Sequence, residues 1–101
     1  MATELRRYVV KDGGLDTVID FFAEIRELRQ RFGFTVEFAA ADRQNSEFIW
    51  AVSHANWADA IREYEQSVER SELFASHSMP LVQRDLRMVE LVSGRSADAN
   101  N

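Results

Sequence analysis

Cysteine is absent from the sequence, and proline and lysine occur only once each among its 101 residues. Without cysteine there is no disulfide framework, no iron–sulfur cluster and no cysteine–zinc site, which fits a reducing cytoplasm. No apolar run approaches the roughly 18 residues that span a bilayer, and residues 1–5 lack a basic-then-apolar signal peptide. We therefore expect a cytoplasmic protein that is neither exported nor inserted into a membrane.

Positive charge is in deficit, because 12 basic residues face 17 acidic ones and the net charge is −5. A phosphate backbone would be repelled on balance, so we do not expect nucleic acid as a partner. Hydrophobic residues make up 46% of the chain and charged residues 29%, as is typical of a folded protein. We expect one domain over residues 1–92 and a small, polar, flexible tail over residues 93–101. The preference for arginine over lysine hints at a GC-rich bacterial genome.

The first half of the chain predicts a strand, a helix and a hairpin. A strand over residues 5–10 ends at a turn that contains glycine. Apolar residues from Leu15 onward recur at helical spacing, and Gly33 is suited to end that helix. Residues 34–40 and 48–54 then alternate between apolar and polar on either side of a polar turn, which predicts two paired strands.

The hairpin has one bulky face if its two strands pair residue for residue, and we expect that face to lie under the helices. The opposite face would hold smaller or polar side chains such as Glu37 and Ser53. The bulky face would hold Phe34, Val36, Phe38, Phe48, Trp50, Val52 and His54.

The second half predicts another helix and a last strand. The side chain of Asn56 is suited to cap a helix whose buried stripe includes Tyr64. A looser helical piece over residues 69–78 is stopped by Pro80, and residues 86–92 predict a strand. The whole order predicts an α+β fold of the ferredoxin-like βαββαβ type, with an antiparallel four-stranded sheet and two helices on one face.

Four short motifs follow one another along the chain: Glu4-Leu5-Arg6 with Tyr8, Gly14-Leu15, Phe48-Ile49-Trp50 and Ser67-Val68-Glu69-Arg70. As a set they resemble the NIPSNAP family over residues 4–92. The resemblance implies a homodimeric α/β barrel, in which two ferredoxin-like sheets face each other and the helices lie outside. The wider superfamily that the chain resembles includes cofactor-independent monooxygenases, polyketide cyclases and lactone isomerases, which hold an aromatic or polyketide-like substrate between the sheet and the helices.

Three residues are candidates for catalysis. His54 could act as an acid or base beside Trp50, because its imidazole has a near-neutral pKa, or it could simply bond a backbone group at the end of its strand. Arg6 and Tyr8 share one face of the first strand, so a guanidinium and a phenol could together hold an enolate or carboxylate. Alternatively, Arg6 pairs with a neighbouring glutamate and Tyr8 is a core residue.

Further side chains are candidates for binding a substrate. Trp50, Phe38 and Tyr64 could line an aromatic pocket, although aromatic residues at this spacing also form ordinary cores. Arg70 could close an anion or carbonyl site, or serve as a charge at a helix end. His77 could reach over the mouth of a pocket as part of a lid, or be exposed to solvent.

No metal and no cofactor are expected. The two histidines do not form a metal-ligand pattern, and no glycine-rich loop marks a nucleotide. The leading hypothesis, which the resemblance implies, is a cofactor-independent cyclase, isomerase or monooxygenase that acts on an aromatic or polyketide-like substrate in bacterial secondary metabolism. The alternative is a non-catalytic ligand-binding or protein-interaction scaffold. In both cases the partners would be a second copy of the chain and a small apolar or aromatic molecule.

Overall fold

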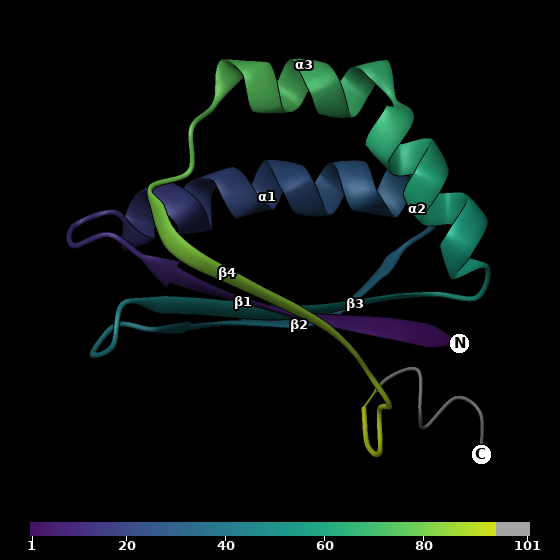
Figure 1. Cartoon of the computed structure of the whole chain (residues 1–101), viewed down its shortest axis with the longest axis horizontal. Coiled ribbons are helices and arrows are strands. Elements are labelled where there is room, and N and C mark those ends of the chain that lie inside the picture. The colour runs from purple at the N-terminus through teal and green to yellow at the C-terminus, as the bar shows by residue number, and fades with distance from the viewer. Residues whose placement is uncertain (95–101) are drawn as a thin grey trace.

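The computed structural model describes residues 1–94, and the fold within this range is the predicted ferredoxin-like one. Four strands form one antiparallel sheet in the order β2-β3-β1-β4, and the helices cover one of its faces (Figure 1). The expected tail over residues 93–101 lies outside the described residues from residue 95 onward. In chain order the elements are β1 (Ala2–Val10), α1 (Leu15–Arg31), β2 (Thr35–Asp42), β3 (Glu47–His54), α2 (Trp57–Gln66), α3 (Val68–Ser76) and β4 (Leu81–Val89).

The last strand differs most from its prediction. It was expected over residues 86–92, but β4 runs from Leu81 to Val89 and pairs with β1 along its whole length. Polar residues interrupt the apolar pattern between Leu81 and Leu86, so alternation could not show that this stretch is a strand. Its conformation comes from backbone pairing, for example between Arg84 and Tyr8.

A β-bulge in β2 overturns the expected position of Phe38. Val36 is opposite Val52, but Phe38 is opposite Ala51, so Glu37 is an extra residue in the ladder. Because side chains alternate along a strand, one extra residue moves everything after it to the other face. The prediction that Phe38 lies under the helices was therefore wrong, and its side chain is 45% exposed.

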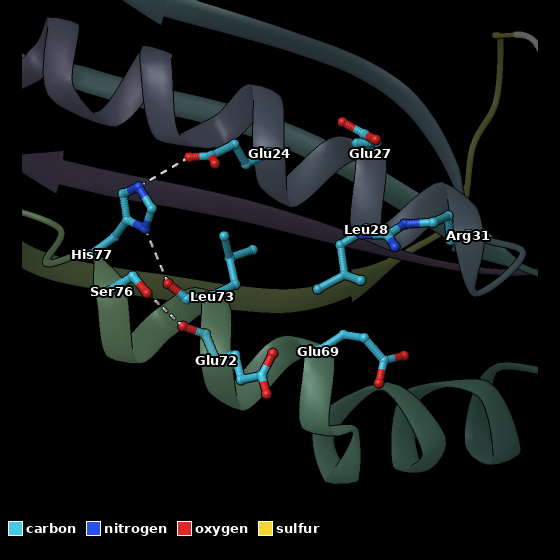
Figure 2. A pocket seen from close by; sticks show the side chains of 9 residues that line it. All are labelled: Glu24, Glu27, Leu28, Arg31, Glu69, Glu72, Leu73, Ser76 and His77. Atoms are coloured by element: carbon cyan, nitrogen blue, oxygen red, sulfur yellow. Dashed lines mark hydrogen bonds and ion pairs between the residues drawn. The ribbon is translucent and has the colours of Figure 1, made fainter.

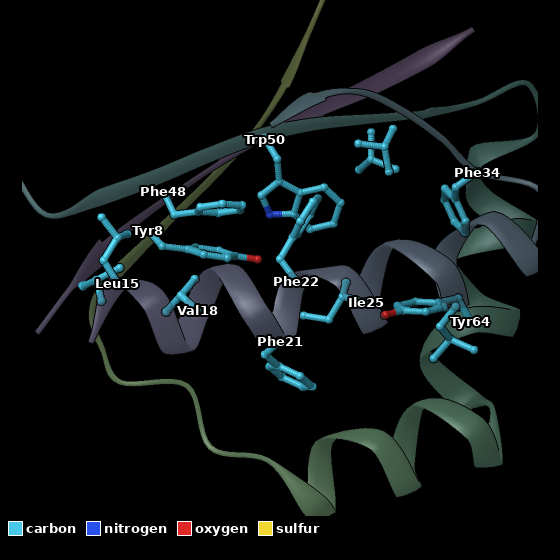
Figure 3. Packing of buried hydrophobic residues seen from close by; sticks show 14 of the residues in the cluster. Tyr8, Leu15, Val18, Phe21, Phe22, Ile25, Phe34, Phe48, Trp50 and Tyr64 are labelled. Atoms are coloured by element: carbon cyan, nitrogen blue, oxygen red, sulfur yellow. The ribbon is translucent and has the colours of Figure 1, made fainter. Parts of the chain in front are cut away.

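Helix α1 supplies one side of the core. Phe22 points to the sheet, where it meets Phe48 and Trp50 of β3, whereas Phe21 points to α3 (Figure 3). The helix ends where Gly33 takes a φ of +85°, a conformation that glycine adopts without steric penalty, which confirms its predicted role. The residues of α1 that are buried against the sheet or α3 are Leu15, Val18, Phe21, Phe22, Ile25, Leu28 and Arg29.

The predicted cap of α2 is in the right place, but its bond is different. Asn56 is the capping residue, yet it makes no side-chain cap and instead donates from Nδ2 to the carboxylate of Asp59 at 3.1 Å. The looser segment beyond α2 forms α3, which Ser67 caps by accepting the backbone N–H of Arg70 at 3.1 Å. Helix α3 lies alongside α1, where Phe74 packs edge-on against Phe21 with the ring centroids 5.3 Å apart (Figure 1).

Candidate functional site

A small cavity lies between the sheet and the helices, and polar and aromatic side chains from six elements converge on it. Its volume is about 20 Å³, room for roughly one water molecule. Any larger ligand would therefore need the wall formed by α3 and the segment after it to move. The lining residues are Arg6, Tyr8, Ile25, Arg29, Trp50, Tyr64, Arg70, Phe74, Met79 and Arg84.

Arg6 and Tyr8 form a hydrogen-bonded pair in this cavity, as their shared face of β1 predicted. Arg6 donates from Nε to the hydroxyl oxygen of Tyr8 at 2.9 Å and from Nη1 to Glu4 at 2.6 Å. Burial by itself would lower the pKa of Arg6, but the contacts with Tyr8 and Glu4 outweigh burial and raise it. The guanidinium is thus fully charged, and the Tyr8 hydroxyl remains able to donate its own proton to a ligand.

Arg29 is the most deeply buried charge at the site, with only 4% of its surface exposed. It follows Ile25 by one helical turn, so α1 directs both side chains to the sheet. Burial lowers the pKa of Arg29, and the nearby charge of Arg6 lowers it further. Within residues 1–94, its Nε and Nη1 atoms have no hydrogen-bond partner. The guanidinium carbon instead lies 4.2 Å from the ring centroid of Tyr64 and 4.9 Å from that of Phe34.

Two further guanidinium groups complete the cavity. Arg70, in the first turn of α3, lies over the rings of Phe74 and Tyr64 at 4.6 and 5.6 Å from their centroids. Arg84, on β4, lies 5.7 Å from the ring centroid of Tyr8, the residue opposite it on β1. Aromatic faces attract such cations without neutralising them. The cavity is therefore strongly positive.

The tyrosines give the cavity two phenolic groups. Tyr8 and Tyr64 approach from opposite ends of the core, and their hydroxyls point toward the region between them (Figure 3). Each hydroxyl can donate one hydrogen bond and accept others. Together with the guanidinium groups, this arrangement can hold a negatively charged oxygen that rests on an aromatic ligand.

Several of the predicted site residues meet at this cavity. Arg6, Tyr8, Trp50, Tyr64 and Arg70 line it together. Their roles in binding and catalysis stay predictions.

Three other predicted residues lie elsewhere. Phe38 is on the far face of the sheet. His54 is at the end of β3, where its Nδ1 accepts the backbone N–H of Asn56 at 2.8 Å. Its ring contacts Phe34 edge-on, with the centroids 5.0 Å apart. That geometry is the backbone-bonding alternative given above, and the catalytic role of His54 stays a prediction.

His77 lies in a separate groove between α1 and α3, with a volume of about 440 Å³ (Figure 2). Its ring stacks on Phe21 at 4.4 Å between centroids, and its Nε2 is 3.1 Å from a carboxylate oxygen of Glu24. Acidic side chains of both helices face this groove, among them Glu69 and Glu72. The groove is on the outer side of α1, away from the sheet.

Sequence reasoning missed Arg29 and Arg84. Arg29 continues the spacing of Leu15, Val18, Phe22 and Ile25, so a charge at the next position of an apolar stripe was a readable signal. Its place in the last turn of α1 has a second explanation, because basic residues favour a helix C-terminus. Arg84 was hidden because the strand that carries it was expected to start later.

No evidence of a metal site or a membrane span emerges from the described part of the chain. Within residues 1–94, no group of three or more histidine, aspartate or glutamate side chains is placed to hold a metal ion. None of the helices in this range has the length and apolar character that crossing a membrane requires.

Comparison with solved structures identifies the fold. The chain is similar to an uncharacterized NIPSNAP domain protein from Burkholderia xenovorans, with a TM-score of 0.77 at 7% identity over 92% of this chain and 96% of that one. For a NIPSNAP family protein from Agrobacterium tumefaciens the TM-score is 0.74 at 12% identity, over 88% and 90%. For an antibiotic biosynthesis monooxygenase it is 0.69 at 12% identity, over 92% and 100%.

Comparison of sequences adds nothing to this picture, since no protein-family model and no curated protein matches the chain. At identities this low, the structural likeness shows the fold alone. It confirms, at the level of fold, the resemblance stated above: the chain has the ferredoxin-like α+β fold that NIPSNAP domain proteins and antibiotic biosynthesis monooxygenases share.

Proposed function

We propose that this protein is a cofactor-independent enzyme that acts on an aromatic or polyketide-like molecule by stabilising an enolate or phenolate in the cavity between sheet and helices. Cyclase, isomerase and monooxygenase reactions of this kind share one step, in which a base takes a proton from the substrate and leaves an oxyanion. Because none of the described lining residues is a histidine or carboxylate, a water molecule from solvent takes up that proton in our proposal. The similarity in fold to an antibiotic biosynthesis monooxygenase is in keeping with this class of chemistry. Bacterial secondary metabolism is the setting that we propose for it.

The observation that carries the proposal is the bond between Arg6 and Tyr8. The guanidinium donates to the phenolic oxygen at 2.9 Å, which leaves the phenolic O–H available to donate to another acceptor. A developing oxyanion would accept that proton's hydrogen bond in a site that excludes bulk water, where such a bond is strongest. The positive charges of Arg29 and Arg84 favour the same oxyanion electrostatically.

Hydrogen–deuterium exchange on an aromatic ketone tests this proposal. In D₂O, exchange at the carbon next to the carbonyl of α-tetralone reports enolate formation and is followed by mass spectrometry. We expect the protein to accelerate the exchange over buffer, and Tyr8→Phe to reduce the acceleration by about 100-fold, as loss of one oxyanion donor does. The melting temperature of the variant should stay within a few degrees of wild type.

Tyr64→Phe is the matched control, because it removes the other phenolic hydroxyl but leaves the Arg6–Tyr8 bond intact. A smaller loss than that caused by Tyr8→Phe is expected. Equal exchange rates for wild type and buffer, with binding of the ketone demonstrated, would contradict catalysis.

A non-catalytic ligand-binding protein is the second candidate, and one observation favours it. Among the described residues that line the cavity, none is a histidine or a carboxylate, the usual proton acceptors of enzymes. A site of this kind holds an anion more readily than it removes a proton. The exchange experiment separates the two candidates, since a binding protein would take up the ketone without accelerating exchange.

We also propose that the protein is a homodimer. Large apolar side chains are exposed on both edge strands of the sheet: Phe38 on β2, and Val82, Leu86 and Met88 on β4. A second copy that covers them would remove this apolar surface from water. Light scattering that gives the mass of a single 11.6 kDa chain at micromolar concentration would contradict the proposal.

A further inference from the structure

Four buried nitrogen atoms have no hydrogen-bond partner among residues 1–94, and they belong to side chains that line the cavity: Nε and Nη1 of Arg29, Nε1 of Trp50 and Nε of Arg70. All of them are hydrogen-bond donors, and the three side chains line the same cavity. Arg29 and Trp50 are 4% and 1% exposed, so solvent does not satisfy these groups. Buried donors in folded proteins nearly always have a partner, and a cluster of unsatisfied ones indicates a missing acceptor.

The guanidinium groups of Arg29 and Arg70 contact aromatic rings and not carboxylates. Arg29 lies over Tyr64, Phe34 and Trp50, and Arg70 lies over Phe74 and Tyr64. Contact with an aromatic face offsets part of the loss of hydration. It leaves Nε and Nη1 of Arg29 and Nε of Arg70 without an acceptor among residues 1–94. The positive charge is thus held in place with its donors open, which is what recognition of an anion requires.

We propose that these donors bind the carboxylate of an aromatic acid, so that the substrate carries an acid group at the Arg29 end of the cavity. The inference rests on the proposed function, because it places the acid in the cavity where Arg6 and Tyr8 stabilise the oxyanion. It adds a recognition element that the reaction itself does not need. The two ends of the cavity then have separate tasks, anchoring at Arg29 and oxyanion stabilisation at Tyr8.

The size and surroundings of the cavity fit an acid of this kind. Its volume of about 20 Å³ accommodates one oxygen atom beside the open donors. Phe74 and Met79 form the adjoining wall and come from α3 and the segment after it. Both side chains are only partly buried, so a shift of this wall would admit an aromatic ring next to Tyr64.

Calorimetric titration of paired probes tests the inference. Benzoate and benzamide have nearly the same shape, but only benzoate carries the charge. We expect benzoate to bind the wild-type protein at least about tenfold more tightly than benzamide, the effect of one charge-assisted hydrogen bond. Inorganic phosphate is the third probe, and it should bind more weakly than benzoate because it gains nothing from the aromatic wall.

Arg29→Met keeps a long side chain in the core but removes the charge. We expect it to abolish the preference for benzoate over benzamide and to melt at or above the wild-type temperature, because an unpaired buried charge is gone. Arg26→Met is the matched control: Arg26 lies on the same helix but is exposed, so both the preference and the melting temperature should match those of wild type.

Each of four other outcomes would refute one part of the proposal. Equal affinity for benzoate and benzamide would refute the carboxylate site and leave the enolate chemistry at Tyr8 untouched. Tight phosphate binding without benzoate binding would refute an organic acid as ligand. A preference for benzoate that survives in Arg29→Met would refute the role of this residue. If deuterium exchange is absent but the preference is present, the proposed catalysis fails and the acid site stands.

Discussion

Arg29 is a charged side chain that is buried as completely as the core residues around it. Bringing an unpaired ion into a protein interior costs several kcal/mol, and stacking on aromatic rings recovers only about 1–2 kcal/mol of this. The residue therefore lowers the stability of the protein on its own. At the scale of single residues, such an arrangement is explained most directly by a ligand that supplies the missing negative charge.

At the residue scale, substitution of His54 tests whether the reaction takes place at the cavity or at the end of β3. Because the cavity lining does not include His54, we expect His54→Gln to keep the rate of deuterium exchange within about twofold of wild type. Loss of the bond from the Asn56 backbone N–H should lower the free energy of unfolding by about 1 kcal/mol. Exchange rates and urea denaturation measure the two effects separately.

The opposite pattern would uphold the catalytic role predicted for His54. If exchange were lost while the free energy of unfolding stayed at the wild-type value, proton transfer would depend on the strand end. The assignment of the reaction to the Arg6–Tyr8 end of the cavity would then be wrong.

At the scale of elements, the central strand β1 links the sheet through its side chains as well as its backbone. On the face away from the helices, Arg7 donates to Glu47 of β3 and to Asp85 of β4, at 2.5 Å each. Hydrogen bonds from Gln83 and Arg7 hold the pKa of Asp85 below its usual range. These ion pairs stabilise the pairing of β1 with β3 and of β1 with β4, on the face of the sheet that the helices do not cover.

This arrangement predicts how stability depends on pH. Because the pKa of Asp85 is lower in the folded protein, its contribution is present above the unfolded pKa of about 3.9 and is lost as pH falls through the folded value. Asp85→Asn should lower the melting temperature by about 2 °C at neutral pH and by less below about pH 3. Melting curves from neutral to acid pH measure the difference.

Asp12→Asn is a control for the general effect of removing one exposed aspartate, since Asp12 lies in the turn after β1. A difference between Asp85→Asn and wild type that stays constant down to about pH 2 would contradict the role assigned to the carboxylate.

The order of the elements could be predicted from the sequence because local signals defined it. The period of α1 and the glycine after it gave that helix its bounds. The bulge at Glu37 could not be predicted, because it depends on how two strands align and leaves no mark in the alternation. The same limit hid the start of β4, whose pairing with β1 is a property of the assembled sheet.

The site was predicted in part for the same reasons. Arg6 and Tyr8 could be placed together because two residues on one strand share a face by geometry. Arg29 and Arg84 could not be joined to them, because only tertiary packing brings α1 and β4 to the same cavity. Local alternation likewise placed His54 on the face of β3 that the helices cover. It could not show that β3 continues past the cavity, so that His54, at the end of the strand, lies outside the cavity.

At the scale of the whole molecule, a net charge of −5 contrasts with a cavity lined by four arginines. Acidic side chains outnumber basic ones along the outer groove between α1 and α3 (Figure 2). The protein thus gathers positive charge at the cavity, and the two arginines there that are largely buried, Arg6 and Arg29, lie where the local dielectric is low and a charge acts most strongly on a ligand. This separation of charge supports our inference that the cavity is a site for an anionic aromatic molecule.

The most direct test of that claim is a nuclear magnetic resonance titration with benzoate, followed at the indole N–H signals. The chain has two tryptophans, of which Trp50 lines the cavity and Trp57 packs outside it against Phe34. Trp57→Phe assigns the two signals. We expect a saturable shift of the Trp50 signal with the Trp57 signal nearly unchanged. A Trp50 signal that stays in place while benzoate binds elsewhere, or does not bind, would contradict an anion site in the cavity.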